Sequence, residues 1–527
     1  MASGVCFETK YIRSVPFAKP PIGDLRFELP SKLESWKSVK NATEFGPSCL
    51  SPEDLIKKKR FHMSEDCLYL NIFTSENCLR SQKCHVLIYF HGGGMDSGSP
   101  NYFPDDFILQ HYVKEDVIFV IPAFRLGVFG SYSFKDESIP KKNLALYDCI
   151  EAIKFVNREI KNFGGDSKNV HLIGHSMGGT IVAALGFSRF VDPHQKLFKR
   201  LLIFSMLPSF VMPELYSENV YNITKLVGCH MYFTDKRKTL DCMKNIDYKT
   251  LMRAQYQLLE NHHYFLGLSR NPPIMLENET VEAFINKCPP REILIGVTKK
   301  ENAFERWPKE NPFVSGSFWN FHNPYEVAEY YDYLQYAPNS TIYEPDSEST
   351  FVGTWLYSKK MAERGGKVFL FQSDQEPGSS HMSDMQYFIG LNTENRTTDM
   401  QLLDSFYSRM LVNFTKYGEP SPNWKTLDPS KMNYFSVQVI STSDTWPTMK
   451  NNFQKECLNF WINNITVFDN FVSRTKHKIF KDETFELNPI SDKWWTYLAI
   501  VGVSFLVAVI LFFIRILIRR RGYISIE

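Results

Sequence analysis

The chain has 527 residues, of which 43% are hydrophobic and 15% aromatic, and a formal net charge of +2. This composition is sufficient for a large buried core, and the near-neutral charge gives no case for nucleic-acid binding. The sequence contains no internal repeat, P-loop, H-E-x-x-H motif or G-x-G-x-x-G motif, so we expect neither a cofactor nor a metal. We interpret the pair His262-His263 as a surface pair rather than a metal site.

The first informative element is a strand followed by glycines. Residues 85–90 (HVLIYF) form an apolar run typical of a buried strand, and His91-Gly92-Gly93-Gly94 follow it directly. Because glycine has no Cβ, this turn can bring backbone N–H groups close to a ligand. We expect the amides of Gly93 and Gly94 to donate to a negatively charged oxygen.

A second strand leads into a sharp turn. The apolar residues 170–173 are followed by the G-H-S-M-G string at 174–178, and residues 178–185 predict a helix. Ser176 is therefore expected at a strand-to-helix turn that exposes its hydroxyl, with the amide of Met177 as a further oxyanion donor. The alternative is a chance or purely structural turn, and the upstream strand-HGGG element argues against it.

A serine nucleophile requires a histidine base and an orienting carboxylate, which follow the G-x-S-x-G turn in the order acid, then histidine. Residues 291–297 predict a strand, and Glu301 lies in the loop after it. Residues 368–371 predict another strand, and His381 lies in the loop that follows. Taken singly, each would be interpreted as an ordinary loop residue. Their order and shared placement predict a triad with Ser176.

Four longer strings complete the pattern. They are residues 15–27, 64–72, 124–130 and 162–166. With these strings, the sequence resembles the type-B carboxylesterases and cholinesterases over nearly all of the part that precedes the hydrophobic tail. The resemblance implies an α/β-hydrolase fold, with a mostly parallel central sheet flanked by helices and the site at the carboxyl ends of the strands. It also selects the same acid and base, because the family's G-V-x-K-x-E pattern ends at Glu301 and its H-x-x-E/D pattern begins at His381.

Three departures from the family pattern concern the pocket. The residue before the nucleophile is usually acidic and is His175 here, and the residue after it is usually alanine and is Met177. The family's S-G-S string corresponds to residues 205–207 (SML). None of these changes removes a catalytic group, but Met177 adds bulk near the acyl position.

Cysteines and sequons predict an oxidising, glycosylating compartment. The resemblance implies disulfides between Cys49 and Cys67 and between Cys229 and Cys242. A third candidate pair brackets a short polar turn at Cys78 and Cys84, whereas no partner is assigned to Cys6, Cys149, Cys288 and Cys457. The predicted glycosylation sites are Asn41, Asn222, Asn278, Asn339, Asn395, Asn413 and Asn464.

The end of the chain predicts a membrane anchor. Residues 494–514 (Trp494 to Ile514) carry no charge and are long enough to cross a hydrocarbon core of about 30 Å, and a buried core helix is the disfavoured alternative. Arginines follow this segment and acidic residues precede it, so its carboxyl end is expected in the cytosol. We therefore predict an enzyme domain over 1–466, a polar, irregular stalk over 467–493, one transmembrane helix, and a short basic tail over 515–527.

The two termini bear on location. Residues 1–10 contain no signal peptide, which on its own would indicate a tail-anchored protein facing the cytosol. The disulfides, sequons and arginine bias oppose this, so we expect a lumenal or extracellular domain, with a missing first segment or insertion directed by the tail. Residues Tyr523–Ile526 resemble a lysosomal sorting signal, which predicts a sorting adaptor and an endolysosomal location. The alternative is a tail without a sorting role, and an acidic lumen would protonate a histidine base whose pKa is near 6.5.

These observations predict a membrane-tethered serine carboxylesterase that forms an acyl-enzyme on Ser176 from a small-molecule ester. One alternative is an acyltransferase that uses the same triad with an alcohol or amine acceptor. Another is an adhesion or receptor-type homologue without catalysis, which the complete triad and the short tail argue against. The acyl and alcohol parts of the substrate and the oligomeric state cannot be inferred from the sequence.

Overall fold

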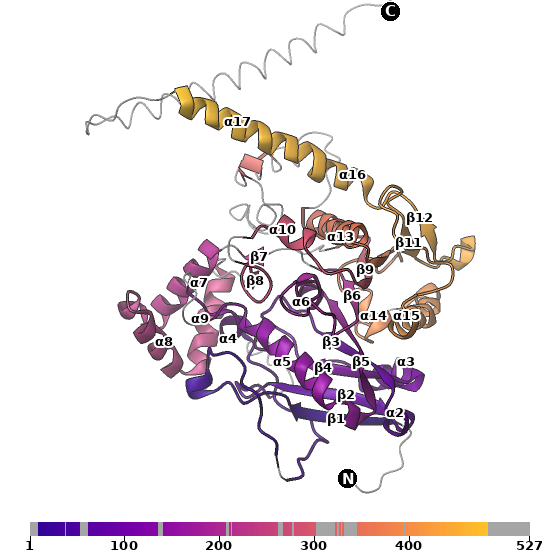
Figure 1. Ribbon diagram of the computed structural model, residues 1–527, viewed down its shortest axis with the longest axis horizontal. Coiled ribbons are helices and arrows are strands. Elements are labelled where there is room, and N and C mark those ends of the chain that lie inside the picture. The colour runs from indigo at the N-terminus through magenta and orange to yellow at the C-terminus, as the bar shows by residue number, and fades with distance from the viewer. Residues whose placement is uncertain are drawn as a thin grey trace, which may run out of the picture. The chain divides into compact units, whose positions relative to one another are not determined.

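Figure 1 shows the computed structural model, which has two compact units, Met1–Val472 and Ser473–Glu527, each treated by itself. The structure describes residues 9–482, apart from residues 37, 53–61, 135–140, 207–209, 212, 262–266, 277–278, 302–321, 324–325, 328, 331–344 and 395.

A central sheet organises the first unit. Within the described residues its strands follow the order β1-β2-β4-β3-β5-β6-β9-β10-β11-β12. Every neighbouring pair from β4 to β11 is parallel, whereas β1, β2 and β12 pair in antiparallel fashion. The sheet is therefore mostly parallel, as the sequence predicts. The strands are β1 Thr9–Pro16, β2 Tyr69–Ser75, β3 Cys84–Phe90, β4 Val117–Pro122, β5 Gly165–His175, β6 Arg200–Phe204, β9 Glu292–Thr298, β10 Lys367–Ser373, β11 Tyr434–Val437 and β12 Thr448–Lys450.

Helices cover both faces of the sheet, because alternate strand residues point to opposite sides. On one face, Ile88 of β3 and Leu172 of β5 belong to a core that also includes residues of α5, α6, α13 and α16. On the other face, Leu87 and Ile173 pack with residues of α3, α14 and α15. These helices are α3 Asp105–His111, α5 Leu144–Glu159, α6 Met177–Phe187, α13 Pro345–Glu363, α14 Met385–Phe388, α15 Thr398–Tyr417 and α16 Lys455–Asn459.

A smaller helical group, which includes α4, lies beside the sheet (left in Figure 1). It has its own apolar core, in which Val128 and Phe129 of α4 belong to the same cluster as Leu251 and Leu258 of α9. The helices of this group are α4 Gly127–Ser131, α7 Pro213–Leu226, α8 Lys236–Asn245 and α9 Tyr248–Glu260. The remaining helices and strands are α2 Glu76–Ser81, β7 Phe210–Val211, β8 Leu268–Ser269, α10 Val281–Asn286 and α17 Thr466–Asp482, and short 3-10 and π turns also occur.

All three predicted disulfides are present and confirmed, at Cys49–Cys67, Cys78–Cys84 and Cys229–Cys242. Each closes a short segment, so together they brace the loops around the amino-terminal strands and the helical group. Of the cysteines without an assigned partner, Cys149, Cys288 and Cys457 are buried, whereas Cys6 lies outside the described residues. The free thiol of Cys149 lies within α5.

The sequons stay predictions, and the structure gives their surroundings. Asn41 and Asn464 are exposed, and Asn222 and Asn413 are half-buried. The side-chain amide of Asn413 donates to the carbonyl oxygen of Pro420 at 3.3 Å, so its nitrogen is less available than that of the two exposed sites. The sequons at Asn278, Asn339 and Asn395, like the pair His262-His263, lie outside the described residues.

The segment predicted as an irregular stalk is helical where it is described. Helix α17 covers Thr466–Asp482, and Phe468 in its first turn packs against Tyr330 in a stacked arrangement. None of the helices in the described part of the chain is both long and apolar enough to cross a membrane. Residues 494–514, the sorting motif and the tail lie outside the described residues, so the anchor stays a prediction.

Candidate active site

Ser176 lies at the turn between β5, which ends at His175, and α6, which begins at Met177. Its backbone has φ 56° and ψ −127°, a conformation that L-residues adopt only where the surroundings enforce it. The flanking glycines make the turn possible. A Cβ on Gly174 would lie 2.1 Å from the Gly178 carbonyl oxygen, and one on Gly178 would lie 2.0 Å from a carbonyl oxygen of β3.

The structure brings together the three residues that the sequence selects. The Oγ atom of Ser176 lies 3.0 Å from Nε2 of His381. The other ring nitrogen, Nδ1, lies 2.6 Å from Oε2 of Glu301. Ser176 is 8% exposed, His381 9% and Glu301 0%, so the chain of hydrogen bonds begins near the surface and ends in the interior.

Glu301 is held by two further donors besides His381. The hydroxyl of Ser205 donates to Oε1 at 2.6 Å, and the backbone N–H of Thr298 donates to the same oxygen at 2.7 Å. Oε2 is thereby left for the imidazole. Because hydrogen bonds stabilise the ionised form, these donors compensate for burying the carboxylate and fix its orientation.

Backbone hydrogen bonds between the loops set these distances. The N–H of Ser176 donates to the carbonyl oxygen of Phe204 at 2.9 Å, and that of Ser205 donates to Gly296 at 2.8 Å. After β9, the N–H of Lys299 donates to the carbonyl oxygen of Ser373 at 2.9 Å. The loops after β5, β6, β9 and β10 are therefore tied to one another just beyond the sheet.

The electrostatics of the site raise the pKa of His381. Burial alone would lower the pKa of its imidazole, but the hydrogen bond to Glu301 and the charges of Glu301 and Asp384 outweigh burial, so the pKa is raised above 6.5. A raised pKa strengthens the base and also means that more of it is protonated in mildly acidic solution.

His175 and Asp384 form a second buried pair beside His381. The imidazole ring centroids of His175 and His381 are 4.9 Å apart, and Nε2 of His175 lies 3.8 Å from Oδ1 of Asp384. The pKa of His175 is lowered, mainly by burial and also by the charge of His381. The pKa of Asp384 is raised to about 7, mainly by burial and also by the charge of Glu301. His175 is therefore neutral at neutral pH and adds no charge where the family usually has an acid.

The HGGG segment lies directly against the nucleophile. A Cβ on Gly92 would lie 2.9 Å from Cβ of Ser176, and Gly93 and Gly94 have φ values of 106° and 64°. Within the described part of the chain, no protein group accepts a hydrogen bond from the amides of Gly93, Gly94 or Met177. These N–H groups are thus available to an external oxygen, with Met177 at the positive end of α6.

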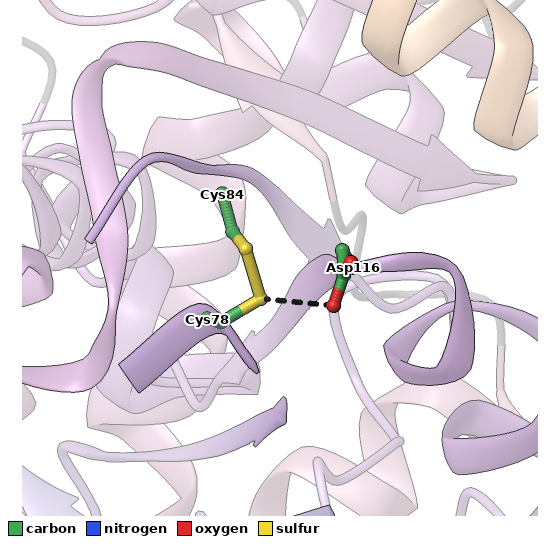
Figure 2. A group of neighbouring side chains, drawn as sticks. All are labelled: Cys78, Cys84 and Asp116. Carbon is green, nitrogen blue, oxygen red and sulfur yellow. Dashed lines mark hydrogen bonds between the residues drawn. A yellow bond between two sulfur atoms is a disulfide. The ribbon is translucent and has the colours of Figure 1, made fainter. Parts of the chain in front are cut away.

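Among the described residues, one group has side chains spaced for a metal ion: Cys78, Cys84 and Asp116. Figure 2 shows that the two sulfurs are joined in a disulfide beside the Asp116 carboxylate. That carboxylate accepts hydrogen bonds from Ser75 at 3.0 Å and Asn77 at 2.6 Å. A disulfide offers no thiolate, so this group is a structural brace at the amino end of β3.

Sequence reasoning missed two parts of this site. Ser205 was expected only to reshape the pocket wall, whereas its hydroxyl binds Glu301. Asp384 appeared only as the end of the H-x-x-E/D pattern, and its proximity to His175 was not foreseen. Ser205 directly follows β6, as Glu301 and His381 follow strands, but this position alone does not indicate which residue it contacts.

A family model and three known proteins are similar to this chain. A family model described as "Carboxylesterase family" matches residues 8–307. Gut esterase 1 of Caenorhabditis briggsae is 26% identical over 545 residues, which cover 89% of this chain and 93% of that protein. Carboxylesterase 1F of Mus musculus is 35% identical over 46% of this chain and 44% of its own length. A solved structure of PNB esterase has the same fold, with a TM-score of 0.72 and 22% identity over 86% of this chain and 96% of that one.

Proposed function

Because the chain belongs to the carboxylesterase family and is a serine carboxylic ester hydrolase, we propose that Ser176, His381 and Glu301 are its catalytic triad. The observation that carries the proposal is the unbroken chain of hydrogen bonds from the Ser176 hydroxyl through the imidazole to the buried carboxylate. The fold is the α/β-hydrolase fold, as expected from the sequence.

In the proposed acylation step, Nε2 of His381 accepts the Ser176 proton while Oγ attacks the carbonyl carbon of the ester. The electron pair of the carbonyl double bond moves onto the oxygen, and the imidazolium then gives its proton to the leaving alcohol. Water repeats these steps on the acyl-enzyme and releases the carboxylic acid. Glu301 stays ionised and keeps the Nδ1–H of the imidazole directed towards itself, so that Nε2 faces the serine.

The developing oxyanion is proposed to bind the amides of Gly93, Gly94 and Met177. Their position beside Ser176 supports this role, since the donors must lie where the charge develops rather than on the ground-state carbonyl. One such donor is worth about 3 kcal/mol of transition-state stabilisation in related chemistry.

We further propose that the enzyme is membrane-tethered, with domain 1–466 outside the cytosol. The uncharged segment 494–514 supports the tether, and the three disulfides support an oxidising compartment. The raised pKa of His381 favours a near-neutral compartment over a strongly acidic one, because a protonated imidazole cannot accept the serine proton.

A fluorophosphonate probe tests the catalytic proposal, because it reacts only with a serine that a base has activated. The wild-type chain should be labelled and Ser176→Ala should not. Ser167→Ala is a matched control, since Ser167 is half-buried at the other end of β5, and its labelling should equal the wild type. A folded wild-type chain that is neither labelled nor able to hydrolyse short-chain esters would favour the non-catalytic, receptor-type role.

A further inference from the structure

We propose that Gln255 of α9 is a positioning residue that holds the oxyanion turn in its active geometry. This inference rests on the proposed function, because it assigns a support to the amides of Gly93 and Gly94. Gln255 lies on the helical group beside the sheet, far along the chain from the turn it contacts. Its side chain is 0% exposed.

The carboxamide of Gln255 bridges two backbone segments. Its Nε2 donates to Oδ1 of Asp96, in the turn that follows the HGGG glycines. Its Oε1 accepts from the backbone N–H of Val128, in the first turn of α4, at 2.6 Å. Helices α4 and α9 lie side by side in Figure 1 and share an apolar core. One buried side chain therefore joins the turn, α4 and α9.

Asp96 transmits this contact to the oxyanion donors, because it belongs to the same hydrogen-bonded turn. Its backbone N–H donates to the Gly93 carbonyl oxygen at 3.0 Å, and the N–H of Ser97 donates to the same oxygen at 2.9 Å. A second link runs from the N–H of Gly127 to the carbonyl oxygen of Met95, at 2.7 Å. A shift of Asp96 would thus rotate the peptide units whose amides face the substrate.

The chemistry of the position requires a side chain that both donates and accepts. Val128 presents a donor and the Asp96 carboxylate presents acceptors, and an amide can satisfy both at once. Gly127 makes room for it, since a Cβ there would lie 2.4 Å from Oε1 of Gln255, and φ is +52°. A buried bridge of this kind is costly to leave half-satisfied, so it holds one geometry rather than several.

A pair of variants tests the proposal: Gln255→Glu introduces a charge repulsion, and a compensating second substitution removes it. Gln255→Glu keeps the acceptor for Val128 but places a carboxylate against that of Asp96, so the turn should be pushed away. We expect kcat for ester hydrolysis to fall about 10- to 100-fold with KM changed less than about threefold, since a misplacement of 1 Å costs on the order of 100-fold. Measurements at pH 8 and pH 9 reduce proton sharing between the two carboxylates, which would otherwise relieve their repulsion.

In the double variant Gln255→Glu with Asp96→Asn, the new amide at position 96 can donate to the new carboxylate at position 255, so a hydrogen bond between the two side chains is restored. We expect it to recover at least about tenfold of the lost kcat, whereas a purely structural role would make the two substitutions additive. The control is Gln257→Glu, which adds the same charge on the exposed side of α9 and should leave kcat unchanged.

Hydrogen exchange of the peptide spanning residues 91–98 gives a readout that does not depend on catalysis. Exchange should rise in Gln255→Glu and return towards the wild-type level in the double variant. The proposal is overturned if Gln255→Glu retains both wild-type kcat and wild-type exchange, or if the double variant recovers neither. A wild-type chain that fails to react with the fluorophosphonate would instead refute the proposed function, while the exchange data would still decide the role of Gln255.

Discussion

Replacing Glu301 by glutamine should stop catalysis without unfolding the protein, because the structure fixes how the new amide must sit. The N–H of Thr298 points at Oε1 from 2.7 Å, so the carbonyl oxygen of the amide must take that place. The NH2 group then occupies the place of Oε2, 2.6 Å from Nδ1 of His381. A donor there forces Nδ1 to accept, which puts the ring proton on Nε2, facing Ser176.

An imidazole with its proton on Nε2 cannot take the proton of the serine, so the base is lost although every heavy atom remains. In serine hydrolases this error of tautomer lowers kcat about 10,000-fold, which corresponds to roughly 5.5 kcal/mol of transition-state stabilisation. The two hydrogen bonds to Oε1 survive in the variant, so the free energy of unfolding should change by less than about 1.5 kcal/mol. The pKa of His381 should also fall, because the charge of Glu301 contributes to raising it.

The assay is kcat for a p-nitrophenyl ester, measured beside thermal unfolding of Glu301→Gln and wild type. Glu376→Gln is the matched control, since Glu376 is a half-exposed carboxylate in the loop after β10 that pairs with Lys300, next to Glu301, and should affect kcat less than twofold. The reasoning is refuted if Glu301→Gln keeps more than about a tenth of wild-type kcat while unfolding at the wild-type temperature.

Three further outcomes are expected. The kcat/KM of the wild type should fall as the pH drops through a pKa above 6.5, because the pKa of His381 is raised and only the neutral imidazole is a base. A midpoint below 6.5 in the pH-rate profile would contradict this prediction. Replacing Cys49 and Cys67 by alanine should lower the free energy of unfolding by about 3 kcal/mol, because the disulfide joins residues separated by 18 positions in the sequence. Denaturant unfolding measures this change, and an unchanged midpoint would count against the prediction. Gly178→Ala should abolish fluorophosphonate labelling, because a Cβ there would lie 2.0 Å from a carbonyl oxygen of β3; wild-type labelling would show that the turn relaxes.

The sequence predicts the sheet and the nucleophile turn well because both depend on local patterns. The run at residues 170–173 is apolar apart from His171, as is typical of a strand buried on both faces, and the structure extends it into β5. Glycines at 174 and 178 are required by contacts within the turn itself. The three disulfides follow from the family resemblance and from short spacing, so they too need no knowledge of the tertiary arrangement.

Outside the triad, the contacts between segments far apart in sequence were not predicted. The bond from Ser205 to Glu301 depends on β6 lying directly beside β9, and the sequence contains no signal for that neighbourhood. Gln255 is one polar residue on an amphipathic helix, which a pattern alone would assign to the surface, and its burial arises from packing against α4. The prediction of an irregular stalk was wrong for residues 467–482, which form most of helix α17. The polar composition of this segment concealed the helical spacing of its apolar residues.

The spatial order of the strands separates the oxyanion turn from the loops that carry the triad, and the proposed support by Gln255 acts on that turn. Across the sheet, β3 is followed by the oxyanion turn, β5 by Ser176, β6 by Ser205, β9 by Glu301 and β10 by His381. From β5 to β10, backbone hydrogen bonds join each loop to the strand or loop beside it. The oxyanion turn lies on the other side of β5, and among the described residues its backbone bonds run within the turn and to Gly127. A mobile turn there would spoil transition-state binding without disturbing the triad, so the bridge from α9 to Asp96 acts where no backbone hydrogen bond joins the described turn to a neighbouring strand.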